Sequence, residues 1–275
     1  MIWKDKFPKE NIYFQVDDGI LYHADCLKII GKFPEGIFDA IITDLPYGIT
    51  ACKWDAIIPF NEMWKEIKKI RKDNTPIILF GHEPFSSLLR ISNLEEYKYD
   101  WYWNKVVASN FLNAKKQPLR NIENIIVFYK KQPTYNPQIT YGFPRKISSA
   151  KNRRITANRF NETDDKLYSK FYPDGLNDYN STKRFPKVLL TFSTDKQKEH
   201  YHPTQKPVAL LKYLIETYTK ENDLVLDFTC GSGTTLIACE ELNRKWIGIE
   251  IERKYCEIAK KRILKVINKK KLKLF

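Results

Sequence analysis

Short apolar runs alternate with amphipathic helical segments in both halves of this chain, and this alternation restricts the fold more than any other feature. The runs are rich in β-branched and aromatic residues, as buried strands are, and they cover residues 20–22, 38–43, 76–80, 224–228 and 246–251. Helical segments are expected at residues 26–33, 61–72, 85–91, 207–219, 234–242 and 254–266. Because strands joined through a helix run parallel, we predict an α/β fold with a doubly wound, mostly parallel sheet.

The middle of the chain interrupts this alternation. Residues 99–103 and 125–129 are expected to form two strands that pair antiparallel at one edge of the sheet. From about residue 130 to residue 198 the periodicity fades, and Pro, Asn, Ser, Tyr and basic residues predominate. We therefore expect one sheet with an irregular insertion rather than two separate domains.

The same middle segment carries most of the positive charge. The chain has 47 Lys and Arg residues against 33 Asp and Glu residues, a formal net charge of +14. Residues 101–200, with 19 basic and 8 acidic residues, supply +11 of this charge. Such a balance favours a polyanionic partner, and a solvated lysine-rich surface is the alternative.

Cysteine spacing and hydropathy both favour a protein of the cytoplasm. The five cysteines include no C-x-x-C pair, so neither a disulfide framework nor a metal site is expected. No apolar run reaches the roughly 18 residues that a membrane helix needs, and residues 1–10 are too charged for a signal peptide. We expect a cytoplasmic protein with reduced thiols and no membrane association.

A glycine turn after the strand at residues 224–228 indicates a nucleoside-containing cofactor. Asp227 ends this strand, and the turn Gly231-Ser-Gly233 opens a helix, so a ligand could approach the backbone closely. Glu250 ends the next strand, where a carboxylate can accept hydrogen bonds from ribose hydroxyls. Leu236 stands where a dinucleotide motif has its third glycine, which disfavours a pyrophosphate-containing cofactor. An ordinary tight turn is the alternative for the two glycines.

The most specific motif is Asp44-Leu45-Pro46-Tyr47, directly after the strand at residues 38–43. An exocyclic base amine is a poor nucleophile because its lone pair is delocalised into the ring. Asp44 could accept a hydrogen bond from that amine, and Pro46 could direct a backbone carbonyl into the pocket. Tyr47 offers a face for stacking on a base that has been extruded from the duplex.

With these motifs the chain resembles the β group of DNA amino-methyltransferases, whose catalytic signature is Asp/Asn/Ser-Pro-Pro-Tyr. In that group the catalytic motif comes first, a target-recognition region follows, and the glycine motif comes last, as in this sequence. The resemblance implies a sheet of the S-adenosylmethionine-dependent methyltransferase type whose chain begins in what is usually its second half. By the same resemblance, residues 1–129 would form the catalytic half, residues 130–200 the target-recognition insertion and residues 201–275 the cofactor-binding half.

The resemblance also assigns residues to the cofactor, S-adenosylmethionine. Thr204 and Lys206, in a His-Pro-Thr-Gln-Lys-Pro segment, would hold its carboxylate, and a surface lysine at a helix start is the alternative for Lys206. The remaining cofactor contacts would be Asp25 at the adenine amine, Glu250 at the ribose, and Asp227, Phe228, Gly231 and Gly233 at the methionine end. Asp25 could equally be a helix N-cap. The chain departs from the family at Leu45, at Phe228 and at Thr229, where other residues are usual.

The activity implied by this resemblance is methylation of adenine N6 in double-stranded DNA, because Asp at the first motif position goes mostly with adenine. The alternatives are methylation of cytosine N4, methylation of RNA or protein, and an inactive DNA-binding protein on the same scaffold. The resemblance also admits a homodimer and a cognate restriction endonuclease as partners.

Basic residues near the aromatic and insertion segments are the predicted DNA contacts. They are Lys115, Lys116, Arg120, Arg153, Arg154, Arg159, Lys183 and Arg184. Trp101 and Trp103 either contact the flipped base or pack within an edge strand.

Overall fold

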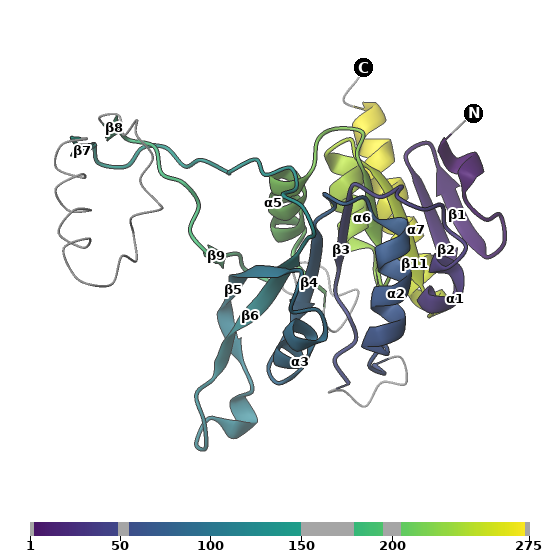
Figure 1. The fold of residues 1–275 in the computed structure, drawn as a ribbon, viewed down its shortest axis with the longest axis horizontal. Helices are drawn as coiled ribbons and strands as arrows, with labels where there is room; N and C mark the ends of the chain where they lie inside the picture. The colour runs from purple at the N-terminus through teal and green to yellow at the C-terminus, as the bar shows by residue number, and fades with distance from the viewer. Residues whose placement is uncertain (1–2, 49–54, 150–178, 195–204, 273–275) are drawn as a thin grey trace. The chain divides into compact units, whose positions relative to one another are not determined.

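The computed structural model describes residues 3–48, 55–149, 179–194 and 205–272, and nine strands of these residues form one mixed sheet (Figure 1). The order across the sheet is β1-β2-β11-β10-β3-β4-β6-β5-β9. The strands are β1 (Ile12–Val16), β2 (Gly19–His23), β3 (Ala40–Thr43), β4 (Ile77–Gly81), β5 (Tyr97–Ser109), β6 (Arg120–Phe128), β9 (Leu189–Thr191), β10 (Leu224–Asp227) and β11 (Lys245–Glu250).

The central strands β2, β11, β10, β3 and β4 run parallel to one another. Strand β1 pairs antiparallel with β2, β6 pairs antiparallel with β4 and β5, and β9 pairs parallel with β5. Strand β10 belongs to the last part of the sequence and strand β3 to the first, yet they are adjacent. The predicted doubly wound, mostly parallel sheet, with its catalytic half first in the chain, is confirmed. This adjacency brings together the carboxyl end of β3, which precedes Asp44, and the carboxyl end of β10, which precedes the glycine turn.

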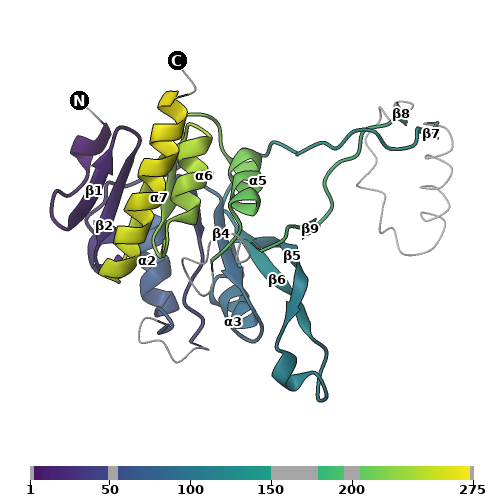
Figure 2. The same cartoon turned by 180° about the vertical axis from the view of Figure 1, so that it is seen from behind.

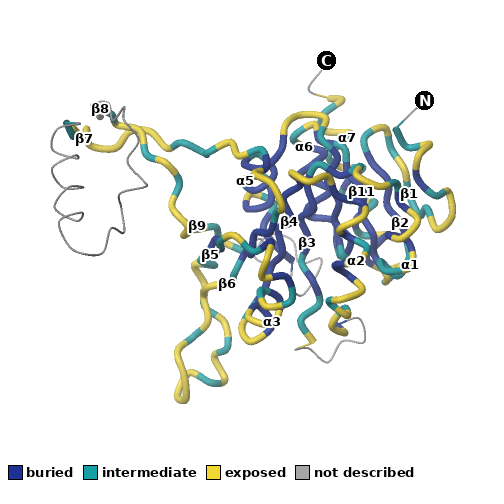
Figure 3. Tube along the Cα trace, in the orientation of Figure 1, coloured by how far each residue is buried: buried dark blue, intermediate teal, exposed yellow. Residues whose placement is uncertain are grey.

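Helices cover both faces of the sheet, as the two opposite views show (Figures 1 and 2). They are α1 (Cys26–Ile30), α2 (Phe60–Ile70), α3 (Phe85–Ser92), α5 (Val208–Tyr218), α6 (Thr234–Glu241) and α7 (Arg253–Leu272), with 3₁₀ turns at Trp3–Lys6 and Phe111–Asn113. Neighbouring strand residues point to opposite faces. Ile41 and Ile77 therefore join the core under α1, α2 and α3, while Ile42 and Ile78 join the core under α5, α6 and α7. Figure 3 shows the central strands buried between these layers.

Three elements differ from the sequence-based expectation. Strand β1 was not expected, although Asp17 and Asp18 make a two-residue hairpin turn between Val16 and Gly19. Strand β9 lies within the segment expected to be irregular, and it pairs with β5, so β5 is not the edge strand. Helix α7 continues past the expected end at residue 266 because lysine favours helix even where apolar periodicity stops.

Residues 137–186 form a compact unit of their own, separate from the unit of residues 1–136 and 187–275. Within it, β7 (Lys146–Ser148) and β8 (Tyr179–Ser181) pair antiparallel. The Arg184 guanidinium donates to the carbonyl oxygens of Pro144 and Ser181, at 2.6 and 3.1 Å. The unit lies inside the range 130–200, for which target recognition stays a prediction. Across all described residues, no helix is both long and apolar enough to span a lipid bilayer.

Candidate active site

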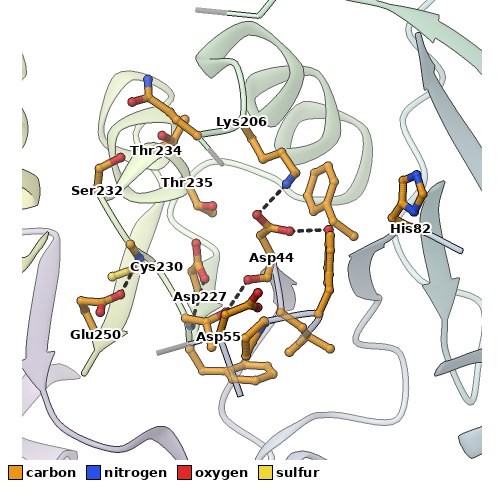
Figure 4. Close-up of a pocket in the computed structure, with 18 of the residues that line it drawn as sticks. Asp44, Asp55, His82, Lys206, Asp227, Cys230, Ser232, Thr234, Thr235 and Glu250 are labelled. Atoms are coloured by element: carbon orange, nitrogen blue, oxygen red, sulfur yellow. Dashed lines mark hydrogen bonds and ion pairs between the residues drawn. The ribbon is translucent and has the colours of Figure 1, made fainter. Parts of the chain in front are cut away.

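A cavity of about 740 Å³ opens at the carboxyl ends of the parallel strands β3, β10 and β11 (Figure 4). The chain leaves β3 toward β4 on one side and β10 toward β11 on the other, so the cavity lies where the strand order reverses. Ligands of open α/β sheets bind at such a point, since the loops there separate. The cavity wall includes the segment from Asp44 to Tyr47, the segment from Asp227 to Ser232, Glu250 and Lys206.

Asp44 is held by two hydrogen bonds, one to each carboxylate oxygen. The Tyr47 hydroxyl donates to Oδ1 at 2.6 Å, and the Lys206 ammonium donates to Oδ2 at 2.5 Å. About a quarter of the Asp44 side chain, 24%, stays exposed to the cavity. Figure 4 shows Lys206 reaching from the segment before α5 down to this carboxylate. The carboxylate is therefore oriented yet still accessible to a ligand.

Lys206 also binds a second carboxylate, Glu123 of strand β6. Its Nζ lies 2.8 Å from Glu123 Oε1, and the Lys105 ammonium lies 2.6 Å from Glu123 Oε2. The side chains of Lys206 and Glu123 are only 8% and 6% exposed. The alternative of a surface lysine at position 206 is therefore wrong. Glu123 was not predicted from the sequence, where its only signal is an acidic residue inside an apolar strand.

These contacts set the protonation of the cluster. Although burial opposes its charge, the two carboxylates raise the pKa of Lys206. Burial likewise opposes the charge of Glu123, but Lys206 and Lys105 hold its pKa at about 2. Burial raises the pKa of Asp44 and Glu123 adds to the rise, while Lys206 and Tyr47 oppose it. The pKa of Tyr47 is raised well above its usual value by burial and by both carboxylates, so its hydroxyl keeps its proton as a donor.

Two threonines connect the catalytic motif to the glycine motif. Thr43 donates to Asp227 Oδ1 at 2.7 Å, and the hydroxyl oxygens of Thr43 and Thr229 lie 2.6 Å apart. The Thr229 hydroxyl also lies 2.9 Å from the backbone oxygen of Asp44, within hydrogen-bond distance. Asp227 is almost fully buried, and that burial raises the pKa of its carboxyl to about 6. Thr229, which departs from the family pattern, thus fixes the backbone of Asp44.

The glycine turn is closed by Glu250. The backbone N–H of Gly231 donates to Glu250 Oε2 at 2.8 Å, and that of Glu252 donates to Oε1 at 2.7 Å. Both Gly231 and Gly233 have positive φ, 51° and 78°, which disfavours other residues. At Gly233 a Cβ would lie 2.8 Å from the Cβ of Ala259 in α7, so this glycine serves close packing behind the turn. Burial raises the pKa of Glu250 to about 7.

The other predicted cofactor residues are placed as follows. Asp25 caps helix α1 by accepting from the Leu27 N–H at 3.0 Å, and it also lines the cavity, so both interpretations of this residue remain compatible. Phe228 and Pro46 line the cavity as well. Thr204 lies outside the described residues. Gln205, not predicted, is buried in the cavity wall, and its Oε1 has no hydrogen-bond partner among the residues described.

The predicted DNA contacts fall into three groups. Lys115 and Lys116 are exposed between β5 and β6, and Arg120 lines the cavity. Lys183 and Arg184 belong to the compact unit of residues 137–186. The last three, Arg153, Arg154 and Arg159, lie outside the described residues.

The two tryptophans of β5 are buried, as the packing alternative requires, although β5 is not the edge strand. The indole N–H of Trp101 donates to the Tyr218 hydroxyl at 2.6 Å, and that of Trp103 donates to the Phe192 carbonyl at 2.8 Å. Trp103 also contributes to the cavity wall. Packing therefore accounts for both indoles, and only Trp103 faces the site.

Comparisons with known proteins agree with this geometry. The model of the N6/N4 DNA methylase family, described as a DNA methylase, matches residues 38–261. The Type II methyltransferase M2.LlaDCHI of Lactococcus lactis subsp. cremoris is 29% identical over 264 residues, which are 92% of this chain and 92% of that protein. The solved M1.HpyAVI–SAM complex aligns with a TM-score of 0.58 and 25% identity over 88% of this chain and 98% of that chain. The PvuII DNA methyltransferase, described as cytosine-N4-specific, aligns over 94% of each chain with a TM-score of 0.65 and 17% identity, a likeness of fold alone.

Proposed function

The chain belongs to the N6/N4 DNA methylase family, and on that premise we propose that it transfers a methyl group from S-adenosylmethionine to N6 of adenine in double-stranded DNA. One observation carries the proposal. The Asp44 carboxylate and the glycine turn closed by Glu250 line the same cavity, so a target amine and a nucleoside cofactor can meet there. Thr43 and Thr229 connect the two motifs and fix their spacing.

The residues of the cavity fit this cofactor. Glu250 uses each oxygen for one backbone N–H, and a carboxylate oxygen can accept a further bond, so ribose hydroxyls have acceptors available. Gly231 has no side chain, so a ligand can approach its backbone closely. The buried Gln205 Oε1 offers an acceptor for a cationic amine. When bound, S-adenosylmethionine supplies an electrophilic methyl group on its sulfonium.

Asp44 would accept a hydrogen bond from the target amine as that amine becomes positively charged. Its side chain is exposed enough for this contact, and Tyr47 and Lys206 keep it from rotating. A positioned acceptor of this kind accelerates proton loss by about 10²–10⁴-fold. Pro46 lines the same wall, where a backbone carbonyl could take the second N–H.

Adenine is proposed over cytosine because Asp44 stands at the first motif position, which in this family goes mostly with adenine. Both amines present two N–H donors, so the carboxylate alone does not select the base. The test is to methylate unmodified DNA with the purified chain, digest it to nucleosides and identify the products by mass spectrometry. We expect N6-methyladenine. N4-methylcytosine without N6-methyladenine would replace the proposed base.

A parallel assay tests the substrate class. Tritiated methyl transfer from S-adenosylmethionine is measured with DNA, RNA and protein as acceptors, and label is expected in double-stranded DNA. Label in RNA or protein alone would contradict the proposal. Binding to DNA without transfer would favour an inactive scaffold. A homodimer and a cognate restriction endonuclease remain further predictions from the family resemblance.

A further inference from the structure

Strands β5 and β6 extend beyond the sheet as a two-stranded arm. Strand β4 pairs with β6 only at residues 124–128, and β9 pairs with β5 only at residues 102–104. Ser109 pairs with Arg120 further out, and residues 110–119 connect the two strands. We call residues 105–122 the arm, and Figure 1 shows it leaving the sheet beyond α3.

The tip of the arm exposes large apolar side chains. Phe111 is 64% exposed and Leu112 is 101% exposed, while Val106 and Val107 on the stem are also more than half exposed. Large apolar side chains that are exposed together indicate a contact surface, because their exposure to water does not stabilise the folded chain. The apolar tip of the arm is therefore expected to contact another molecule.

The tip also has a defined conformation. Asn110 adopts the left-handed region at φ 73°, and its side-chain oxygen accepts from the Asn113 amide at 2.8 Å. The backbone N–H of Asn113 donates to the Asn110 carbonyl at 3.0 Å, and that of Lys116 donates to the Asn113 carbonyl at 2.8 Å. These bonds close a 3₁₀ turn that holds Phe111 and Leu112 side by side at the end of the arm.

Charge identifies the kind of partner. The sequence has no acidic residue between Asp100 and Glu123, whereas Lys115 and Lys116 lie three and four residues after Leu112 and Arg120 begins the return strand. A surface that is apolar at its end and cationic around it matches duplex DNA, which has apolar base stacks inside and phosphates outside. A second copy of this chain, with its net charge of +14, would be repelled by the same lysines.

Position connects the arm to the reaction. Lys105, Val107, Asn110 and Arg120 line the cavity that contains Asp44, so the stem forms part of the wall that an extruded base would pass. An enzyme that acts on an extruded base must first break the stacking of that base on its neighbours. Apolar side chains that enter the base stack offset the free-energy cost of the lost stacking.

We propose that the tip of the arm is a wedge in which Phe111 and Leu112 enter the base stack and occupy the space that the target base leaves. Lys115 and Lys116 neutralise the phosphates beside the gap. This inference rests on the proposed function, because it requires a base that is extruded into the cavity.

The test compares Phe111→Ser/Leu112→Ser with the parent chain on two duplexes that contain the methylated site once sequencing has located it. One duplex is fully paired, and the other has an abasic site opposite the target base, which lowers the cost of extrusion. The control variant is Ile91→Ser/Leu94→Ser, which replaces side chains of similar exposure, 71% and 65%, away from the arm. We expect the arm variant to methylate the paired duplex about tenfold more slowly or worse. On the abasic duplex both variants should stay within about twofold of the parent, as surface substitutions do.

The other outcomes would contradict the proposal that the tip is a wedge. If the arm variant methylates both duplexes equally more slowly than the parent, the arm binds DNA without aiding extrusion. If its rate equals that of the parent on both duplexes, the arm neither binds DNA nor aids extrusion. If sedimentation shows that the parent is an oligomer and the arm variant a monomer, the tip is an interface between copies. A parent chain that methylates no DNA would remove the proposed function and the wedge together, whereas an active parent matched by the arm variant would remove the wedge alone.

Discussion

Lys206 donates a 2.5 Å hydrogen bond to Asp44, so the lysine that the family resemblance assigns to the cofactor holds the carboxylate of the catalytic motif. The same ammonium lies 2.8 Å from Glu123, and it is the bridge between two carboxylates that would otherwise repel each other. A cofactor carboxylate that bound Lys206 would compete with these contacts. Under the proposed cofactor assignment, the cofactor carboxylate and Asp44 would share this one ammonium.

Replacement of Lys206 by methionine should destabilise the fold. The change leaves Asp44 and Glu123 without their shared cation in a buried site, and removal of one partner from such a pair costs about 3 kcal/mol in the free energy of unfolding. Urea unfolding measures this loss. The control is Lys212→Met, which breaks the more exposed pair with Glu241 and should change the same quantity by less than about 1 kcal/mol.

A second substitution separates charge from packing in that result. If the loss in Lys206→Met comes from unpaired charge, Glu123→Gln in the same chain should restore part of it, because one buried carboxylate is then neutral. A double variant as unstable as the sum of the two single variants would show that the loss in Lys206→Met does not come from unpaired charge on Glu123.

Asp44→Ala should strongly slow methyl transfer while it leaves cofactor binding in place. The carboxylate acts on the target amine, and its loss should slow transfer by a factor of about 10²–10⁴. Calorimetry with S-adenosylmethionine and tritiated transfer to DNA measure the two properties separately. Asp73→Ala is the matched control, since its carboxylate pairs with Lys130 and Lys131 on the surface. Turnover close to that of the parent would remove Asp44 from the reaction.

The placement of Asp44, Asp227 and Glu250 at one cavity could be predicted from local sequence. Asp44, Asp227 and Glu250 each follow or end a strand, and parallel strands bring their carboxyl ends to one edge of a sheet. The strands themselves were recognisable as apolar runs because they are buried on both faces.

Glu123 and β9 could not be predicted in the same way. Glu123 reaches Lys206 only because β6 pairs between β4 and β5, and no local pattern encodes that pairing. Strand β9 has three residues, too few for a periodic signal. The role of Lys206 was assigned by resemblance, whereas its contacts with Asp44 and Glu123 depend on long-range packing.

Glu250→Ala should weaken cofactor binding and leave Asp44 in place. A hydrogen bond to a charged group contributes about 2 kcal/mol, so we expect the dissociation constant of S-adenosylmethionine to rise by roughly thirtyfold. Calorimetry measures this change, and circular dichroism checks that the turn at Gly231 still folds. Glu241→Ala, on the surface of α6, is the control. An unchanged dissociation constant would move the ribose site away from Glu250.

The stability of the chain should depend on pH through Glu250. Burial raises the pKa of this carboxyl from 4.5 to about 7, so between these values the folded chain holds a proton that the unfolded chain has released. Proton binding to the folded state stabilises it, and this contribution is complete below pH 4.5 and is lost as the pH rises to about 7. The free energy of unfolding should therefore fall with rising pH in this window, by on the order of 1 kcal/mol per pH unit.

Glu250→Gln tests that dependence because the amide does not titrate. Thermal and urea unfolding of parent and variant are compared at several pH values between 5 and 8. Asp227, whose pKa is raised to about 6, contributes a slope of the same sign to both chains. The difference in the free energy of unfolding should shift in favour of the variant as the pH rises to about 7 and then stay level. Parallel pH profiles for the two chains would show that Glu250 is already ionised in the folded chain at pH 5.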